Sequence, residues 1–419
     1  MFNRKAEQQR PTGKKPYLLV LTSTFPRYSG DSEPPFVFEL SRRLKDDFRV
    51  IVLAPHAPGI RDIERLSGII VVRYRYFVER WEQLAYDGGI LARLRYNRWL
   101  YALVPFLLLA QMLVVQRLLK RYDFAAIHAH WLIPQGFVAV LITLFFNKKP
   151  AILLTSHGGD LFGLRGFLFN IILGWVLQRS SAISTVSNAM RDEIIERWKV
   201  PKNKVVIIPM GVDIRKIFIP NLTTTRECNT LLFVGRLVKK KGVKYLLEAM
   251  AYVVKKYPKC RLLIVGSGPE AVAIKKYVEN LHLDQQVTFL GRIENERLPT
   301  FYRSATIFVA PCVIAEGGDQ EGLGLVLVEA LACACPVITT DLPAIRDVVI
   351  HERTGVLVSE RDSYSLANAI LDLLNNPGKR KQLADKGREY VEEHFDWEKV
   401  TKSYAHLLKK LIHFHNVSD

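Results

Sequence analysis

The sequence predicts an α/β protein built of two doubly wound, Rossmann-like domains that face each other across a cleft. Its 419 residues exceed the roughly 100 to 200 residues of one ordinary domain. Short β-branched and apolar runs alternate with longer amphipathic segments almost throughout, which is typical of parallel sheets covered by helices. This alternation stops once, at residues 214–229, and then restarts. We therefore expect two separate cores joined by a linker.

The first half of the chain contains six runs of strand character, with a helix expected from about Phe36 after the first run. The runs are YLLVLTS, VIVLA, AAIHAH, AILLTSH, AISTVS and KVVIIPM. Strands that alternate with helices in this way favour a parallel sheet. We assign residues 16–213 to this first domain.

The second half repeats the pattern after the linker, residues 214–229, which lacks clear periodicity and holds Pro220. The strand runs are TLLFVGR, RLLIVGSG, VTFLGR, TIFVAP and PVITT, with helices expected from about Val243, Glu270 and Leu323. Residues 230–395 therefore form a second Rossmann-like domain. Residues 396–415 have apolar side chains near helical spacing, which predicts a terminal helix that crosses back to the first domain.

Composition indicates a globular protein with anionic partners. Hydrophobic residues make up 49% and charged residues 24%, a balance that excludes a disordered chain. The formal net charge of +18 predicts attraction to phosphorylated ligands, an acidic membrane leaflet or nucleic acid. No nucleic-acid-binding motif is recognisable and the basic residues are spread along the chain, so we expect no nucleic-acid partner. Five cysteines without a Cys-x-x-Cys pair favour neither disulfides nor zinc and fit a reducing cytosol.

Two segments bear on location. The first sixteen residues are polar and basic without an apolar stretch, so we expect a cytoplasmic protein without a secretory signal. The longest apolar run, from Trp99 to Val115, contains Pro105 and Gln111 and falls short of the ~20 residues of a spanning helix. Its arginine and lysine flanks suit a helix on an anionic membrane surface, which would make the protein peripheral on the cytoplasmic face. A core helix with snorkelling ends fits equally well.

The segment EGLGLVLVE, residues 321–329, carries two carboxylates around an expected helix start near Leu323. Glu321 would precede the first turn, where free N–H groups attract phosphate and where its own oxygens could accept sugar hydroxyls. Glu329 would lie on the second turn of an apolar helix, where a carboxylate needs hydrogen-bond donors such as a ribose diol. Two solvated surface glutamates are the alternative, which the apolar flanks disfavour.

The segment VGRLVKKKG places cations after a strand that ends at Gly235. Arg236 and Lys241 follow on the loop, and two fixed cations can clamp a diphosphate and stabilise the charge of a leaving nucleotide. The neighbouring Lys239 and Lys240 are expected to form a solvated basic turn.

In LLTSHGGDLFG, a strand delivers His157 and Asp160 to the carboxyl edge of the first sheet, where ligands of open α/β sheets bind. The two glycines between them permit close approach of a substrate. The segment IHAHWLIPQG places His128 and His130 at another strand end. A zinc site at this histidine pair lacks further ligands, so we expect no metal.

Together these segments resemble the family-4 retaining glycosyltransferases of GT-B fold, and the resemblance covers nearly the whole chain. It implies that Glu321 contacts the transferred sugar, Glu329 the donor ribose and His157 the sugar at the catalytic centre, with Arg236 and Lys241 on the diphosphate. Further implied contacts are Gly235, Gly266, Gly268, Gly322 and Leu323 on the donor side, and Gly30, Asp31, His130 and Asp160 on the acceptor side.

The activity implied by this resemblance is transfer of a sugar from a UDP- or GDP-linked donor to a glycan, lipid-linked or other cell-envelope acceptor. A front-face mechanism, in which the leaving phosphate oxygen helps to deprotonate the acceptor, needs neither a metal nor a cofactor. The chain departs from the family pattern at Met210, where asparagine is usual, and at residues 341–344, where a glycine pair is common.

Two other functions fit the same architecture. A sugar-nucleotide 2-epimerase would need acid and base groups around C2 and C3 of the sugar rather than this glutamate spacing. An inactive nucleotide-sugar-binding protein would retain the donor residues alone.

Overall fold

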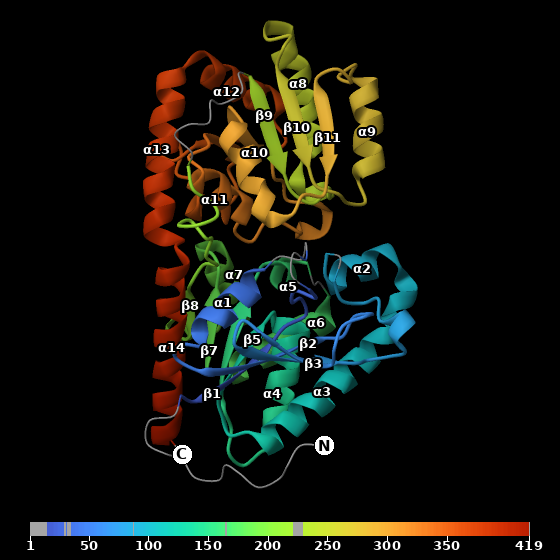
Figure 1. The fold of residues 1–419 in the computed structure, drawn as a ribbon, viewed down its shortest axis with the longest axis vertical. Helices are drawn as coiled ribbons and strands as arrows, with labels where there is room; N and C mark the ends of the chain where they lie inside the picture. Colours follow the sequence, from blue (N-terminus) through green and yellow to red (C-terminus); the bar gives the residue numbers. More distant parts are fainter. Residues whose placement is uncertain are drawn as a thin grey trace.

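The computed structural model describes residues 15–28, 31, 35–86, 88–163, 166–220 and 229–418. Within these residues an eight-stranded and a six-stranded sheet form two α/β domains that are stacked along the long axis of the molecule (Figure 1). The predicted fold class is therefore confirmed. The predicted linker is only partly described, because residues 221–228 lie outside the described ranges.

The first sheet has the strand order β3-β4-β2-β1-β5-β6-β7-β8. Its strands are β1 (Tyr17–Leu21), β2 (Arg49–Pro55), β3 (Ile63–Leu66), β4 (Ile69–Tyr74), β5 (Phe124–His130), β6 (Ala151–Ser156), β7 (Ala182–Thr185) and β8 (Val205–Ile207). Only the β3–β4 pair is antiparallel among the described pairs. The six predicted runs correspond to β1, β2 and β5 to β8. The β3–β4 hairpin was not predicted. Strand β3 is a short, half-exposed edge strand, and β4 follows it with no helix between them, so the hairpin departs from the strand–helix alternation.

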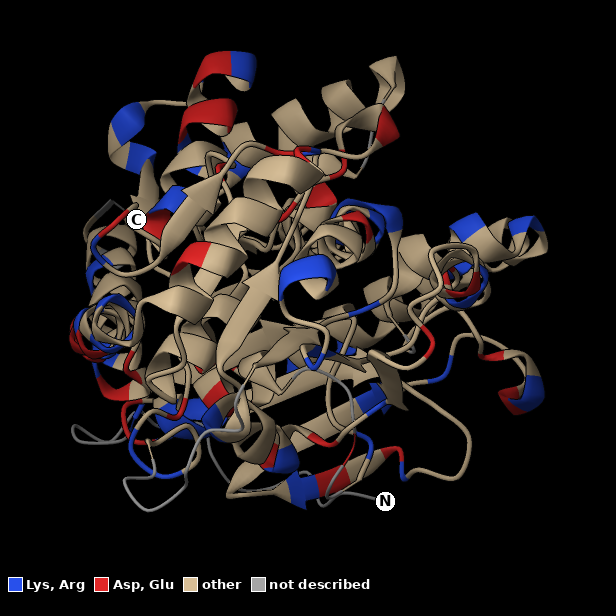
Figure 2. Cartoon of the chain, turned by 90° about the horizontal axis from the view of Figure 1, so that it is seen from above, with Lys and Arg blue, Asp and Glu red and all other residues tan. Residues whose placement is uncertain are grey.

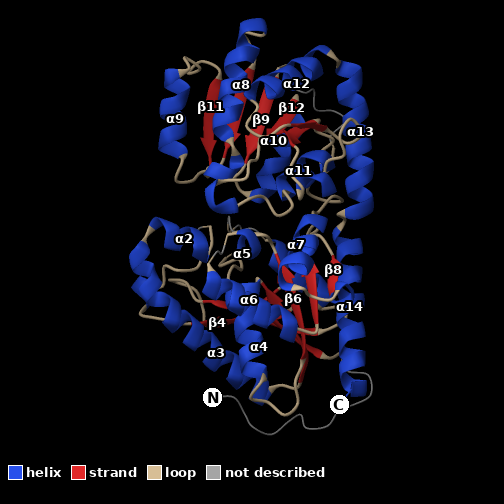
Figure 3. Ribbon diagram, turned by 180° about the vertical axis from the view of Figure 1, so that it is seen from behind, coloured by secondary structure: helices blue, strands red, loops and turns tan. Residues whose placement is uncertain are grey.

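Helices cover both faces of this sheet. They are α1 (Phe36–Leu44), α2 (Ile90–Tyr96), α3 (Val104–Arg121), α4 (Phe137–Thr143), α5 (Gly159–Phe162), α6 (Phe167–Arg179) and α7 (Asn188–Trp198). The terminal helix α14 (Trp397–Ser418) packs beside α1 and against β5 and β6. Helices α3, α4 and α6 form the opposite layer, which faces the viewer in Figure 3. Right-handed crossovers between successive parallel strands explain why these three helices share one face.

The second sheet has the order β11-β10-β9-β12-β13-β14, and its described pairs are all parallel. Its strands are β9 (Thr230–Val234), β10 (Arg261–Val265), β11 (Val287–Gly291), β12 (Ile307–Ala310), β13 (Val337–Thr340) and β14 (Val356–Val358). Its helices are α8 (Val243–Lys256), α9 (Ala271–Asn280), α10 (Leu298–Ser304), α11 (Leu325–Ala332), α12 (Ser363–Asn375) and α13 (Pro377–His394). Helix α11 begins at Leu325 rather than near Leu323, because Gly324 has a φ of 86° and cannot belong to a right-handed helix.

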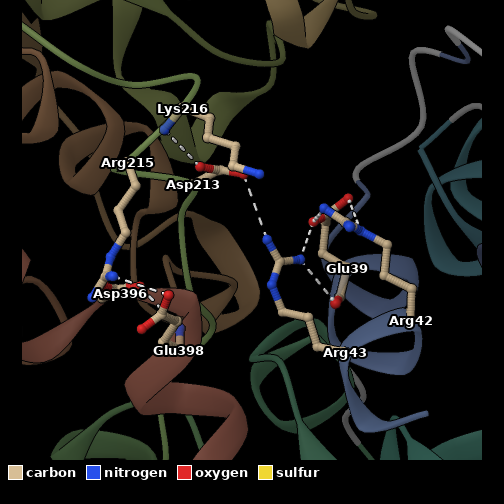
Figure 4. A network of polar contacts seen from close by, with 8 residues as sticks. All are labelled: Glu39, Arg42, Arg43, Asp213, Arg215, Lys216, Asp396 and Glu398. Atoms are coloured by element: carbon tan, nitrogen blue, oxygen red, sulfur yellow. Dashed lines mark hydrogen bonds and ion pairs between the residues drawn. The ribbon is translucent and has the colours of Figure 1, made fainter. Parts of the chain in front are cut away.

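The chain passes between the domains twice, and the two passages lie side by side. The backbone N–H of Val212, after β8, donates to the carbonyl of Phe395, between α13 and α14, at 2.9 Å. Figure 4 shows the ion pairs around this junction: Arg215 binds Asp396 at 2.7 Å, and Arg43 of α1 approaches Asp213 at 3.5 Å. These contacts tie α1, the segment after β8 and the start of α14 together.

Candidate active site

A cleft of about 1140 Å³ lies between the two domains, at the carboxyl ends of strands from both sheets. The sequence-predicted residues that line it are Asp31, His157, Gly235, Arg236, Lys241, Gly266, Gly268, Glu321, Leu323 and Glu329. A cleft of this size at the edges of two open α/β sheets is where small-molecule ligands bind. The fold therefore brings the motifs of both halves to one site.

Lys241 and Glu321 form a largely buried ion pair in the wall of the cleft formed by the second domain. We call this the donor-side wall, because the family resemblance predicts the donor contacts there. Their Nζ and Oε2 atoms lie 2.7 Å apart, and their side chains are 12% and 17% exposed. Burial acts to raise the pKa of Glu321, but the charges of Lys241 and Lys240 outweigh it and lower this pKa to about 2. Burial likewise opposes the charge of Lys241, yet Glu321 raises its pKa. Both groups are thus held ionised at neutral pH.

Gly242 places Lys241 in this position. It has a φ of 63°, and a Cβ atom there would lie 1.8 Å from the carbonyl oxygen of Pro311. Only glycine allows the lysine turn to approach the loop that leads from β12 to Glu321.

Glu329 lies on α11 and faces the cleft. The buried hydroxyl of Tyr302, from α10, donates to its Oε2 at 2.9 Å. Burial raises the pKa of Glu329 to about 7, although the Tyr302 hydrogen bond and the Lys241 charge act to lower it. Nothing in the sequence around Tyr302 indicates this role, since the two residues meet only through the packing of α10 on α11.

Backbone at the ends of β9 and β10 forms the adjoining wall. A Cβ at Gly266 would lie 1.9 Å from the carbonyl oxygen of Gly235, and one at Gly268 would lie 2.3 Å from that of Leu237. These glycines are therefore required by contact between the two loops. Arg236 extends from the first loop, and its Nη1 donates to the carbonyl of Gly88 in the other domain at 3.0 Å.

His157 forms the opposite wall, at the end of β6. Its ring lies 4.8 Å from that of Phe36 and 4.9 Å from that of Trp131, and its Nε2 is 3.0 Å from Nδ1 of His130. Burial lowers the pKa of His157 to about 3, so the ring is neutral at neutral pH. A neutral imidazole can donate or accept a hydrogen bond at a sugar hydroxyl.

His130 and Asp160, which were predicted to contact the acceptor, are buried and do not line the cleft. Asp160 accepts from the backbone N–H of Leu132 at 2.7 Å and from the Ser156 hydroxyl at 2.9 Å. It also accepts from the backbone N–H of His157 at 3.2 Å. The turn into the short helix α5 directs this carboxylate back beneath the loop. Asp160 and His130 therefore position His157 instead of facing the substrate.

Gly322, which was predicted to contact the donor, is not among the residues that line the cleft and lies against the first domain. A Cβ at Gly322 would lie 2.7 Å from the carbonyl oxygen of His157, and one at Gly158 would lie 2.8 Å from the Cα of Gly322. These two glycines allow the loop before α11 to meet the loop after β6.

The loop after β1 contributes Asp31 to the cleft, whereas Gly30 lies outside the described residues. The carboxylate of Asp31 accepts from Nε and Nη2 of Arg27, each at 2.9 Å. Asp31 therefore fixes its own loop.

Lys240 differs from the solvated residue that was expected. Its side chain is 22% exposed, lines the cleft and lies 3.1 Å from Asp319, whereas Lys239 is 67% exposed as predicted. Asp319 also binds Arg95 of α2, at 2.7 Å, across the cleft. Because Lys239, Lys240 and Lys241 are identical neighbours, the sequence does not indicate which of their side chains face the cleft.

Two further features bear on the expected partners. Among the described residues, no group of three or more His, Cys, Asp or Glu is placed to hold a metal ion. Figure 2 shows lysine and arginine interspersed with aspartate and glutamate over both domains. The expectations of a metal-independent protein without a nucleic-acid partner stay predictions.

Two family models match the chain, Glycosyltransferase Family 4 over residues 35–216 and Glycosyl transferases group 1 over residues 215–390. Among curated relatives, N-acetyl-alpha-D-glucosaminyl L-malate synthase of Bacillus anthracis is 27% identical over 68% of this chain and 74% of the relative. The GDP-mannose-dependent alpha-(1-6)-phosphatidylinositol monomannoside mannosyltransferase of Mycobacterium tuberculosis is 27% identical, and the match covers 62% of this chain and 69% of that relative. The solved structure of sucrose-phosphate synthase from Thermosynechococcus elongatus has a TM-score of 0.77 and 25% identity, and the match covers 95% and 99% of the two chains.

Proposed function

The chain belongs to the group 1, family-4 glycosyltransferases of GT-B fold, and we propose that it transfers a sugar from a nucleoside diphosphate with retention of configuration. The acceptor is a hydroxyl group of a glycan, a lipid-linked sugar or another cell-envelope molecule. Membership of this family gives the glycosyltransferase activity, and we propose the retention of configuration, the donor class and the acceptor class.

The observation that carries the proposal is the largely buried Lys241–Glu321 pair, which lines the same cleft as Arg236. Two cations held against the backbone loops after β9 and β10 suit the diphosphate of a donor. As the bond between sugar and phosphate breaks, negative charge grows on the leaving phosphate, and fixed cations in a dry cleft stabilise it. We propose that these cations do so without a metal ion.

The acceptor step follows from the same placement. Glu321 is ion-paired and strongly ionised, which suits a hydrogen-bond acceptor for sugar hydroxyls. The leaving phosphate oxygen then takes the acceptor proton on the face of the sugar that it leaves. Neutral His157, across the cleft, orients the sugar by a hydrogen bond. This arrangement gives retention with no covalent intermediate on the chain.

The donor is a nucleoside diphosphate sugar in which Glu329 receives the ribose hydroxyls. The mycobacterial relative is named as GDP-mannose-dependent, which supports this donor class. Uridine and guanosine diphosphate sugars are both candidates.

A thermal-unfolding panel of nucleotide diphosphate sugars tests donor binding. A donor at 100 times its Kd stabilises the folded chain by about 2.7 kcal/mol. We expect a shift with one donor that Glu329→Ala abolishes. No shift with any donor would contradict the proposal.

Product analysis with the identified donor tests the reaction. NMR of the product should show the anomeric configuration of the donor, and inversion would contradict the mechanism. Donor incubated without acceptor separates the alternative functions, because a 2-epimerase would convert it to its epimer.

A further inference from the structure

The outer helical layer of the first domain presents large apolar side chains to solvent. Helix α3 contacts α4, and α4 contacts α6, so the three form one continuous layer (Figure 3). On α3, Phe106, Leu109 and Leu113 are 48%, 55% and 43% exposed. Large apolar groups gathered on one surface of a folded domain indicate a partner that covers them.

Helix α3 is apolar on two faces, although packing requires only one. Its buried residues are Leu107, Gln111, Val115 and Leu118, which face the core at helical spacing. The exposed residues 106, 109 and 113 follow the same spacing on the other side. By length and composition the segment Arg98–Arg121 could cross a membrane. Its inner face, however, is part of the domain core, so the helix lies along a surface.

The apolar surface continues on both sides of this stripe. The 3₁₀ segment η2 (Arg98–Leu103) exposes Trp99 by 87% and Tyr101 by 56%, and α6 exposes Phe167 by 83% and Leu168 by 66%. Tryptophan and tyrosine are the residues that favour the boundary between lipid and water.

Exposed cations border the stripe. Arg98 precedes it, and Arg117 and Lys120 continue it one and two turns beyond Leu113. No ion pair to another described residue is found for these three side chains. An apolar stripe bordered by cations fits an anionic lipid surface, since lipid tails take the apolar groups and headgroups the charges.

The layer also reaches the mouth of the cleft. Arg95, between η2 and the cleft, donates to the carbonyl of Gly163 at the approach to α6, at 3.2 Å, and pairs with Asp319 at 2.7 Å. Asp319 stands two residues before Glu321. A bilayer against α3 and α6 would therefore lie beside the entrance to the active site.

We propose that residues 98–121 and the start of α6 dock on an anionic bilayer and that the acceptor is a lipid-anchored molecule drawn from it. This inference rests on the proposed function, which it deepens by naming the acceptor class. The enzyme then works as a peripheral protein on the cytoplasmic face.

Flotation of the full chain with vesicles tests the surface. Vesicles of phosphatidylcholine alone are compared with vesicles that also contain phosphatidylglycerol, at low and high salt. We expect binding to the anionic vesicles only, weakened by salt. The triple variant Phe106→Ser/Leu109→Ser/Leu113→Ser and the double variant Arg117→Gln/Lys120→Gln should each lower the partition coefficient about tenfold or more.

Matched controls come from the second domain, where Val272 and Tyr364 are exposed by 80% and 64%. The variants Val272→Ser/Tyr364→Ser and Lys256→Gln/Lys259→Gln should bind vesicles as the unaltered chain does. Equal loss in test and control variants would overturn the proposal, as would equal binding to neutral vesicles. Resistance to alkaline carbonate would assign a membrane span, and a dimer abolished by the triple variant would assign a second copy of the chain.

Donor binding by the same variants separates this inference from the proposed function. If the donor stabilises every variant but vesicles bind none of the proteins, only the docking surface is wrong. If vesicles bind and no donor does, the proposed function fails. Transfer to a lipid-anchored acceptor should fall with vesicle binding, while donor hydrolysis without acceptor stays unchanged.

Discussion

The two walls of the cleft differ in how they hold their polar groups. The donor-side wall keeps a charged pair, Lys241 and Glu321, whose pKa values are displaced in opposite directions so that both stay ionised. The acceptor-side wall keeps neutral imidazoles, with the pKa of His157 lowered to about 3, and places Asp160 behind the surface. In the proposed reaction, permanent charge thus faces the anionic diphosphate, while neutral groups face sugar hydroxyls.

The largest effect is expected from Lys241→Met. The variant loses a cation that stabilises the leaving phosphate, so kcat/KM should fall about 10²- to 10³-fold. It also leaves Glu321 buried without its partner, which costs about 3–5 kcal/mol of folding free energy in urea unfolding.

The double variant Lys241→Met/Glu321→Gln is the control for this loss. It should recover most of the stability and none of the activity. If activity returned with stability, the pair would be structural, and the charged character of this wall would have no part in catalysis.

The next effect concerns the neutral wall. His157→Ala removes one hydrogen bond to the reacting sugar, which is worth about a 10- to 100-fold loss in kcat. The pKa of His157 is about 3. A plot of kcat against pH for the unaltered enzyme should therefore show no histidine titration between about pH 5.5 and 7.5, the range in which an ordinary imidazole ionises. An inflection near pH 6.5 that His157→Ala abolishes would show that this wall carries charge after all.

The third effect concerns Glu329, a carboxylate of the donor-side wall whose pKa is raised by burial. The pKa of Glu329 is about 7 in the folded chain against an ordinary 4.5, so the folded state binds this proton more tightly than the unfolded state. The stability it contributes is full below pH 4.5 and is lost as the pH rises through 7, by the order of 3 kcal/mol. Urea unfolding of Glu329→Gln should lack this dependence.

Donor affinity should change in the opposite direction. Ribose hydroxyls donate better to the ionised carboxylate, so Kd for the donor should fall about tenfold between pH 6 and pH 8. Tyr302→Phe removes a hydrogen bond that lowers the pKa and should move this transition to higher pH. A donor Kd that is independent of pH would contradict the assignment of Glu329.

The smallest effects come from the two neighbouring lysines. Lys240→Met should raise KM by about threefold to tenfold, because it breaks one partly buried charged contact to Asp319. Lys239→Met should change neither KM nor stability, since a surface ion pair contributes about 0–1 kcal/mol. The same substitution at Lys241, Lys240 and Lys239 thus compares the loss of activity at a buried, a partly buried and an exposed cation. Equal losses at all three would show that net charge matters instead of position.

The sequence predicts the fold well because the same strand-then-helix pattern recurs many times along the chain. Most buried strands are apolar runs, and several of the helices that follow them, such as α1 and α8, carry an amphipathic pattern. The β3–β4 hairpin escapes this pattern because β3 is half exposed and because no helix separates β2, β3 and β4. The start of α11 was placed two residues early, because Gly324 takes a left-handed conformation that an apolar sequence does not reveal.

The candidate site is predicted less completely. Motifs at strand ends identify Glu321, Glu329, Lys241 and His157 because parallel strands deliver them to one edge. They do not show which side chains turn away from the cleft. Asp160 and His130 were predicted to face it but are buried behind His157. Tyr302 could not be found at all, since its link to Glu329 depends on the packing of two helices.

The junction in Figure 4 sets the mechanics of the molecule. Because both passages of the chain lie at one edge, beside α13 and α14, we expect the domains to open and close by rotation about that edge. Displacement in such a rotation grows with the length of the lever arm. The Arg43–Asp213 pair lies at this junction (Figure 4), whereas Arg236 contacts Gly88 just before α2, on the side of the molecule opposite α13 and α14 (Figure 1). The separation of the Arg236 guanidinium from the Gly88 carbonyl should therefore change more with the opening angle than the contacts at the junction do.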